Sequence, residues 1–272
     1  MMARGAASSV PTWAKVIAVV LALGTLSISV PLVALGAFWL VSVRVTRHIE
    51  LSAPLAAGAK LVVSADQATI ELKPGRAGLV VVKVVDWTRV TTNSGLQPLQ
   101  RVNATLHAIS DGQRLDVGSA HEPDINLGAE TDVTVEVPVG TPLEVTAGSV
   151  TAAGLSGSFQ IAAGQGQVSL HDMTVTQSSY VHGAGPVTFS GLVQQGSLEL
   201  TSGFGGIEAR LNRLSDARIE ADTTIGDITA DPWLGLTISS GSISTHASGV
   251  MGPGTGLVTL RTGLGNIKIE FN

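Results

Sequence analysis

Seven copies of a short motif, Gly-x-Val/Ile, form a spaced series in the second half of this 272-residue chain and limit the folds that the chain can adopt. The motifs are 15 to 24 residues apart, about 20 on average. Each is followed by alternating residues, and most are preceded by a second alternating run. Alternation with period two indicates a strand that buries one face. The motifs begin at Gly148, Gly166, Gly185, Gly205, Gly226, Gly241 and Gly265.

Each repeat unit therefore predicts a strand, a glycine corner and a second strand. Such short strands are not stable alone, whereas stacked units share one core. We expect a single-stranded, right-handed β-solenoid over residues 143–272. A β-sandwich with hairpins at the glycines is the alternative, and the regular period favours the solenoid. The predicted inward residues are Val150, Ile161, Val168, Val187, Leu200, Ile207, Ile228, Ile243 and Ile267.

Residues 58–142 are also rich in alternating runs, but they lack the regular period. We expect them to form an irregular β cap on the solenoid, because an exposed first edge would pair with other chains. The fold class is thus all-β, with the cap at 58–142 and the repeats at 143–272. The predicted cap strands are Leu61–Ala65, Ala68–Leu72, Leu79–Val85, Arg101–Ile109, Arg114–Val117 and Val133–Val137.

Residues 16–43 form a run of 28 residues without a charged side chain. About 20 apolar residues suffice to span a bilayer as an α-helix, whereas a cleaved signal peptide has a core of about 7–15. We therefore expect a tail at 1–15, one transmembrane helix at 16–43, a juxtamembrane linker at 44–57 and the β domain at 58–272. Lys and Arg are nearly balanced on the two sides of the helix and do not fix its orientation.

Composition excludes several classes of protein. The chain has no cysteine, so it has no disulfide scaffold, thiolate nucleophile or cysteine zinc site. No Lys or Arg lies between Arg114 and Arg210, which argues against binding nucleic acid, since that binding depends on clustered cations. Few lysines and many Ser, Thr and Gly suit an exported domain. We expect a single-pass protein of the cell membrane with residues 51–272 outside the cytoplasm.

The stretch from Val133 to Val150 reads VTVEVPVGTPLEVTAGSV, with Val-Pro-x-Gly at residues 137–140 before the first repeat. This pattern, followed by the series of Gly-x-Val/Ile motifs, resembles the bacterial putative-adhesin family, also called the toastrack domain, over residues 58–272. The resemblance implies a non-enzymatic envelope domain, often anchored by one helix, that acts in adhesion or in sensing the state of the envelope. It carries over no binding residues. Gly205, doubled by Gly206, and a loop expected at Ser248–Gly256 depart from the pattern.

Histidines and acidic residues are the candidates for chemistry. No two of the six histidines have the i, i+4 spacing of a helical zinc motif, although His171 and His182 fall one repeat apart. We assign no metal, cofactor or catalytic residue. Glu220, Asp222, Asp227 and Asp231 gather within two repeats, and carboxylates on adjacent coils can act as acid and base on a polysaccharide.

Two functions follow from these observations. The first is a membrane-anchored, adhesin-like domain without enzymatic activity, which interacts with an envelope protein or a polysaccharide or senses the envelope. It rests on the predicted anchor, on the repeats and on outward positions rich in Thr, Ser, Gln and Glu. The alternative is a carbohydrate-active β-helix enzyme that uses Asp222, Asp227 and Asp231.

Overall fold

The structure is a computed structural model that describes residues 43–90, 102–119 and 130–272. The chain divides into two compact units, and the larger comprises residues 45–88 and 96–272. The predicted tail at 1–15 and all but the last residue of the predicted helix at 16–43 lie outside the described residues. Among the residues that are described, no helix has the length and apolar character needed to cross a membrane.

The described residues confirm the all-β class, because they form strands and one short 3-10 helix, η2 (Pro232–Leu234). The first strands are β1 (Val43–Pro54), β2 (Lys60–Pro74), β3 (Leu79–Val90), β4 (Val102–Ile109), β5 (Gly112–Ser119), β6 (Glu130–Val137) and β7 (Leu143–Ala153). The middle strands are β8 (Ser156–Gly157), β9 (Phe159–Ala163), β10 (Val168–Val175), β11 (Ser179–Gly183), β12 (Val187–Val193), β13 (Ser197–Ser202) and β14 (Ile207–Leu211). The last are β15 (Ala217–Ile225), β16 (Ile228–Ala230), β17 (Thr237–Ser240), β18 (Thr245–Met251), β19 (Gly256–Leu264) and β20 (Ile267–Phe271).

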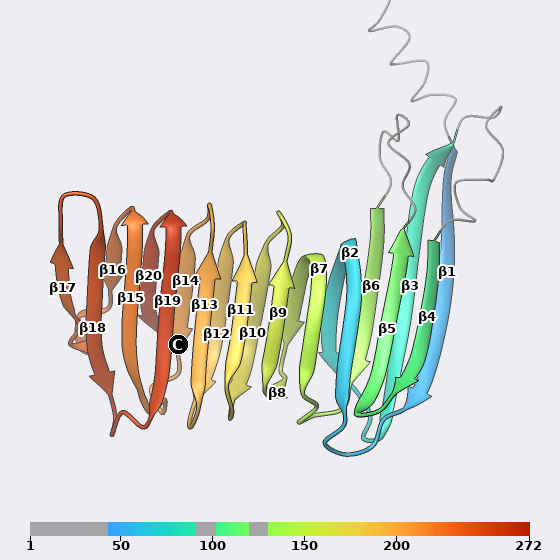
Figure 1. The fold of residues 1–272 in the computed structure, drawn as a ribbon, viewed down its shortest axis with the longest axis horizontal. Helices are drawn as coiled ribbons and strands as arrows, with labels where there is room; N and C mark the ends of the chain where they lie inside the picture. The colour runs from blue at the N-terminus through green and yellow to red at the C-terminus, as the bar shows by residue number, and fades with distance from the viewer. Residues whose placement is uncertain (1–42, 91–101, 120–129) are drawn as a thin grey trace, which may run out of the picture. The chain divides into compact units, whose positions relative to one another are not determined.

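Successive parallel strands stack into coils that have two faces (Figure 1). Face A contains, in spatial order, β5, the first half of β2, the first half of β7, β9, β11, β13, β19, β15, β18 and β17. Face B contains β3, β6, the second halves of β2 and β7, then β10, β12, β14, β20 and β16. The arrangement is solenoid-like, as the repeat predicts.

The order of the coils differs from the order of the repeats in the sequence. Strand β13 pairs with β19 rather than with β15, and β19 pairs with β15 on its other side. On face B, β20 lies between β14 and β16 in the same way. The C-terminal coil, residues 256–271, is therefore inserted between two coils that are consecutive in the chain. At the other end, β2 lies between β7 and the later strands β5 and β6.

The apolar residue of the repeated motif forms a continuous column inside the stack. Each member sits opposite the next in strand register on face B, and each is buried. In spatial order the motif residues are Val150, Val168, Val187, Ile207, Ile267 and Ile228, and Ile70 of β2 extends the column beyond Val150. Ile161 and Leu200 are buried on face A as well. Eight of the nine predicted inward residues are therefore correctly placed.

The prediction for the ninth residue, Ile243, is wrong, because its side chain is 71% exposed. Gly241 does not begin a coil. It lies in the turn of a hairpin between β17 and β18, which pair antiparallel. The loop predicted at Ser248–Gly256 is wrong in its first half, since β18 extends to Met251 and pairs antiparallel with β15. Likewise, most of the segment predicted as a linker at 44–57 belongs to β1, which pairs with β3.

The corner glycines are required by close contact between coils. A Cβ atom added to any of Gly166, Gly185, Gly205, Gly265 or Gly226 would lie closer than 3.0 Å to backbone of the preceding corner. The successive contacts run from Gly148 to Gly166, Gly185, Gly205, Gly265 and Gly226, which is the spatial order of the coils. The glycines thus form a stack in which no side chain fits.

A ladder of hydroxyl groups runs beside this glycine stack. Buried Ser or Thr side chains near the ends of the face A strands donate hydrogen bonds to the carbonyl oxygens of the neighbouring corners. The bonds join Ser202 to Gly185 (2.9 Å), Thr262 to Gly205 (2.8 Å), Thr223 to Gly265 (2.9 Å) and Thr245 to Gly226 (3.2 Å). Each hydroxyl gives a hydrogen-bond partner to a corner carbonyl group. A buried carbonyl group without a partner would destabilise the fold by roughly 1–3 kcal/mol.

The turn that leads into the inserted coil is tied to the start of β15. The backbone N–H of Thr255 donates to Asp216 at 2.9 Å and its hydroxyl donates at 2.6 Å. These hydrogen bonds, the hydroxyl bond first, hold the pKa of Asp216 below its ordinary value. The two bonds thus join the turn before β19 to the residue that precedes β15.

Replacing Gly185 by Ala is expected to destabilise the fold by about 1–3 kcal/mol, the usual cost of overpacking. The added methyl group would meet the carbonyl oxygen of Gly166, which the strand ladder holds in place. Gly164 is the matched control, because a Cβ there has only an ordinary contact at 3.8 Å. Denaturant unfolding of Gly185→Ala and Gly164→Ala measures the difference. Equal midpoints for the two variants would contradict the corner packing.

Candidate functional site

The acidic residues that the sequence groups together do not meet in one site. Glu220 and Asp222 lie on β15 of face A, whereas Asp231 directly follows β16 of face B. Asp222 Oδ1 lies 2.7 Å from His246 Nδ1. The Oδ1 atom of Asp231 accepts a hydrogen bond from the backbone N–H of Trp233 at 3.0 Å and caps η2. Asp227 occupies the exposed corner after Gly226. The geometry of a paired acid and base is therefore not assembled from these residues.

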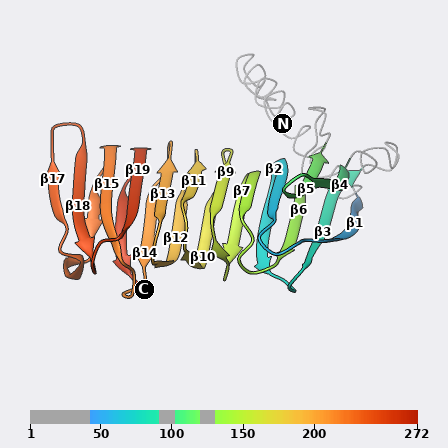
Figure 2. The ribbon, with the colours of Figure 1, turned by 60° about the horizontal axis from the view of Figure 1, so that its bottom comes forward.

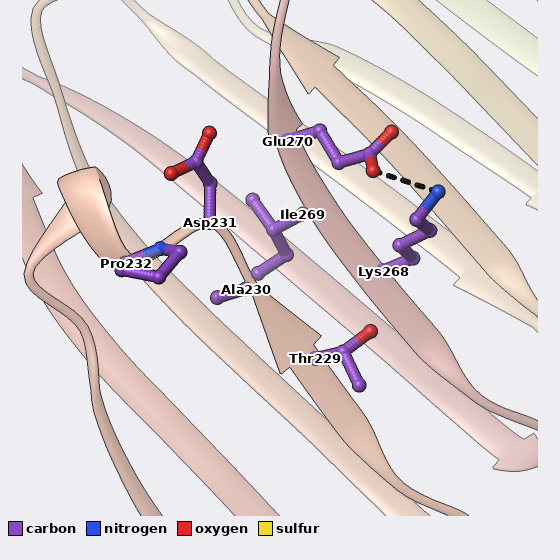
Figure 3. A pocket seen from close by; sticks show the side chains of 7 residues that line it. All are labelled: Thr229, Ala230, Asp231, Pro232, Lys268, Ile269 and Glu270. Carbon is purple, nitrogen blue, oxygen red and sulfur yellow. Dashed lines mark ion pairs between the residues drawn. The ribbon is translucent and has the colours of Figure 1, made fainter.

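One shallow pocket does contain Asp231, and Figure 3 shows its lining. Across it, Glu270 forms an ion pair with Lys268 at 2.7 Å. The hydrogen bond from Lys268 is the main cause that holds the pKa of Glu270 below its ordinary value. A general acid needs the opposite shift. The lining residues are Thr229, Ala230, Asp231, Pro232, Lys268, Ile269 and Glu270.

The same ion pair belongs to an exposed network on two neighbouring strands of face B. Arg210 contacts Glu208 at 2.7 Å and Glu270 at 3.4 Å, and Lys268 reaches Glu208 at 4.0 Å. The four residues face each other in register across β14 and β20. Exposed ion pairs of this kind contribute little stability. In this network, two positive side chains balance two negative ones. In this pocket the two charges of β20 are thus paired with each other, and Asp231 is used as the cap of η2.

The two histidines one repeat apart lie on opposite faces. His171 is on β10 of face B and His182 is on β11 of face A, and both are exposed. Within the part of the chain that the structure describes, no group of three or more His, Asp or Glu side chains is arranged to hold a metal ion.

A second hollow, of about 410 Å³, lies on the outer side of face A. It is centred on three strands in register, with Thr146 of β7 opposite Ala162 of β9 and Ala162 opposite His182 of β11. The side chain of Ala162 is much smaller than those of its neighbours, which leaves the depression. The lining residues are Glu144, Val145, Thr146, Gln160, Ile161, Ala162, Tyr180 and His182.

The adjacent row of side chains supplies the chemistry of this hollow. Glu144, Gln160 and Tyr180 are in register on the same three strands. The Tyr180 side chain is 49% exposed, and Glu144 is paired with Lys60. The hollow therefore combines an aromatic surface with amide, imidazole and carboxylate groups that can donate and accept hydrogen bonds. Such a surface suits a neutral polar ligand that also has an apolar face.

Tyr180 was not singled out by the sequence, although a signal was present. It is the only tyrosine of the chain, and the alternation around Val181 places it on the outer side of its strand. Its partners Glu144 and Gln160 come from strands whose register is visible only in the structure. A lone outward aromatic residue in a repeat is the feature that would have pointed to this position.

No family profile matches the sequence, and no curated protein matches it. Among solved structures, the chain is similar to a putative cell adhesion protein from Clostridium sporogenes, with 13% identity, 83% of this chain and 100% of that chain covered, and a TM-score of 0.46. A putative adhesin from Bacteroides fragilis has 9% identity, 82% and 97% coverage and a TM-score of 0.33. One from Parabacteroides distasonis has 11% identity, 83% and 97% coverage and a TM-score of 0.32. These descriptions agree with the adhesin family that the sequence resembles.

Proposed function

We propose that this protein is a non-enzymatic, adhesin-like module, anchored in the cell membrane by residues 16–43, that binds a polysaccharide outside the cytoplasm. The choice of a polysaccharide as ligand rests on the hollow on face A. The separation of the candidate carboxylates onto two faces favours binding over hydrolysis. We also propose that the coils wind with a right-handed sense, as connections between parallel strands nearly always do.

The size and chemistry of the hollow favour a polysaccharide over a protein partner. A stable protein interface buries about 800 Å² on each side and centres on several apolar anchors. The hollow presents one aromatic side chain, Tyr180, with polar groups around it. A sugar ring can stack its C–H face on the tyrosine while its hydroxyls bond to Gln160, His182 and Glu144. Because the hollow lies on an open face, a long polymer can pass through it without being enclosed.

The Tyr180→Ala variant of the full chain is expected to bind purified cell-envelope polysaccharide about tenfold more weakly, or ~1.4 kcal/mol. The loss arises because the ring face against which the sugar packs is removed. Affinity electrophoresis in gels that contain the polysaccharide measures it. Tyr180→Phe keeps the ring and should retain most of the binding. Phe204→Ala removes another exposed aromatic ring, 77% exposed, and serves as the control. Equal retardation of Tyr180→Ala and the unmodified chain would remove the basis for this site.

The proposed anchor has its own test. The full chain should sediment with membranes and resist extraction by high salt, because about 20 apolar residues are enough to hold it in the bilayer. A chain that begins at Val43, the first residue of β1, should be released as a folded, strand-rich protein. Fractionation followed by circular dichroism measures both properties. Release of the full chain by a salt wash alone would overturn the anchor.

A further inference from the structure

The last strand of face A, β17, is an open edge. Among the described strands it pairs with β18 on one side and with none on the other. Figure 1 and Figure 2 both place it at the end of the stack. All four of its residues, Thr237 to Ser240, are exposed. An edge of this kind presents backbone groups that can pair with another strand.

The core also remains open at this edge. A column of apolar side chains runs along the inner side of face A, and its members are aligned by strand register. Leu200, Leu260, Ala221 and Ala247 are completely buried, whereas Ile238, the last member, is 43% exposed. The strand that would cover Ile238 is missing from the described part of the chain.

The free backbone groups of β17 can be assigned from its hairpin. The N–H of Gly241 donates to the carbonyl oxygen of Ser244 at 2.8 Å, which closes the turn. In an antiparallel ladder the residues that bond to the partner alternate with residues whose groups point away. The N–H and C=O groups of Ile238 and Ser240 therefore point away from β18, toward the open edge.

The usual protections of an edge strand are missing here, apart from its short length. Proteins guard such edges with charged side chains, proline or bulges. No Lys, Arg, Asp or Glu occurs from Pro232 to Leu260, and Trp233 is 86% exposed nearby. By contrast, β1 at the opposite end carries Arg47, His48 and Glu50 on exposed positions. The β17 end of the stack is thus open to pairing with another strand, whereas charged side chains protect the β1 end.

We propose that β17 docks edge to edge with β17 of a second copy of this chain, antiparallel and around a two-fold axis at Ile238. This register pairs the outward backbone groups of Ile238 with those of the other copy and places the two isoleucine side chains on the same side. An uncharged edge can face its own copy without repulsion, and a two-fold contact closes after two subunits. The contact is independent of the polysaccharide site on the outer side of face A.

Because the chain has no cysteine, a single Ile238→Cys substitution tests the contact directly. Hydrogen-bonded residues across an antiparallel pair have Cα atoms about 5.5 Å apart, which is within the range of a disulfide. The full chain in detergent micelles should form a disulfide-linked dimer under mild oxidation, at least tenfold faster than Leu214→Cys. Leu214 is 80% exposed and measures random collision. Light scattering of the unmodified full chain should show a dimer that Ile238→Lys dissociates and Ile225→Lys does not.

Three results would overturn the proposal. Ile238→Cys could cross-link no faster than Leu214→Cys. The unmodified chain could form a dimer that Ile238→Lys leaves intact, which would place the contact elsewhere, for example in the anchor. In intact cells, the Ile238→Cys variant could cross-link to a different protein instead of to its own copy.

Discussion

Close contact between successive corner glycines determines how the coils of this protein stack. At each corner the backbone passes so near the preceding carbonyl oxygen that no Cβ fits from Gly166 through Gly226. Buried hydroxyls of Ser202, Thr262, Thr223 and Thr245 then bond to the corner carbonyls. Together these contacts set the register between coils, and that register aligns the column of Val and Ile side chains that forms the core.

A stack built in this way separates folding from function. Only a few residue types fit the inward column and the corners. The outward side chains do not pack in the core, so their residue types can vary. Register between three strands brings Glu144, Gln160 and Tyr180 into one row, and the small side chain of Ala162 opens the hollow beside them. The same register places the ion pairs of Glu208, Arg210, Lys268 and Glu270 on the other face. Each face therefore has its own chemistry.

The sequence predicts the parts of the fold that depend on neighbouring residues. Alternation and the Gly-x-Val/Ile motif locate the corners and the buried column, because both follow from period-two burial within one coil. The order of the coils could not be predicted, since a motif does not specify which other motif it contacts. Gly241 and Ile243 match the pattern but form a hairpin turn, and the unequal intervals on either side of Gly241 are the only trace of that change. The predicted grouping of the acids was wrong for a related reason. Asp222 and Asp231 are close in sequence, but a corner separates them and they lie on opposite faces.

Paired cysteines test whether the C-terminal coil lies between β13 and β15. Thr201 faces Arg261 in register, and Arg261 faces Asp222, so Thr201 and Asp222 are separated by one coil. Adjacent strands are about 4.8 Å apart, whereas a separation of two strands exceeds the roughly 7 Å limit for a disulfide. The chain with Thr201→Cys and Arg261→Cys should form an intramolecular disulfide under mild oxidation, and the chain with Thr201→Cys and Asp222→Cys should not. A disulfide in the second chain and none in the first would show that the coils follow sequence order and that the C-terminal coil is not inserted.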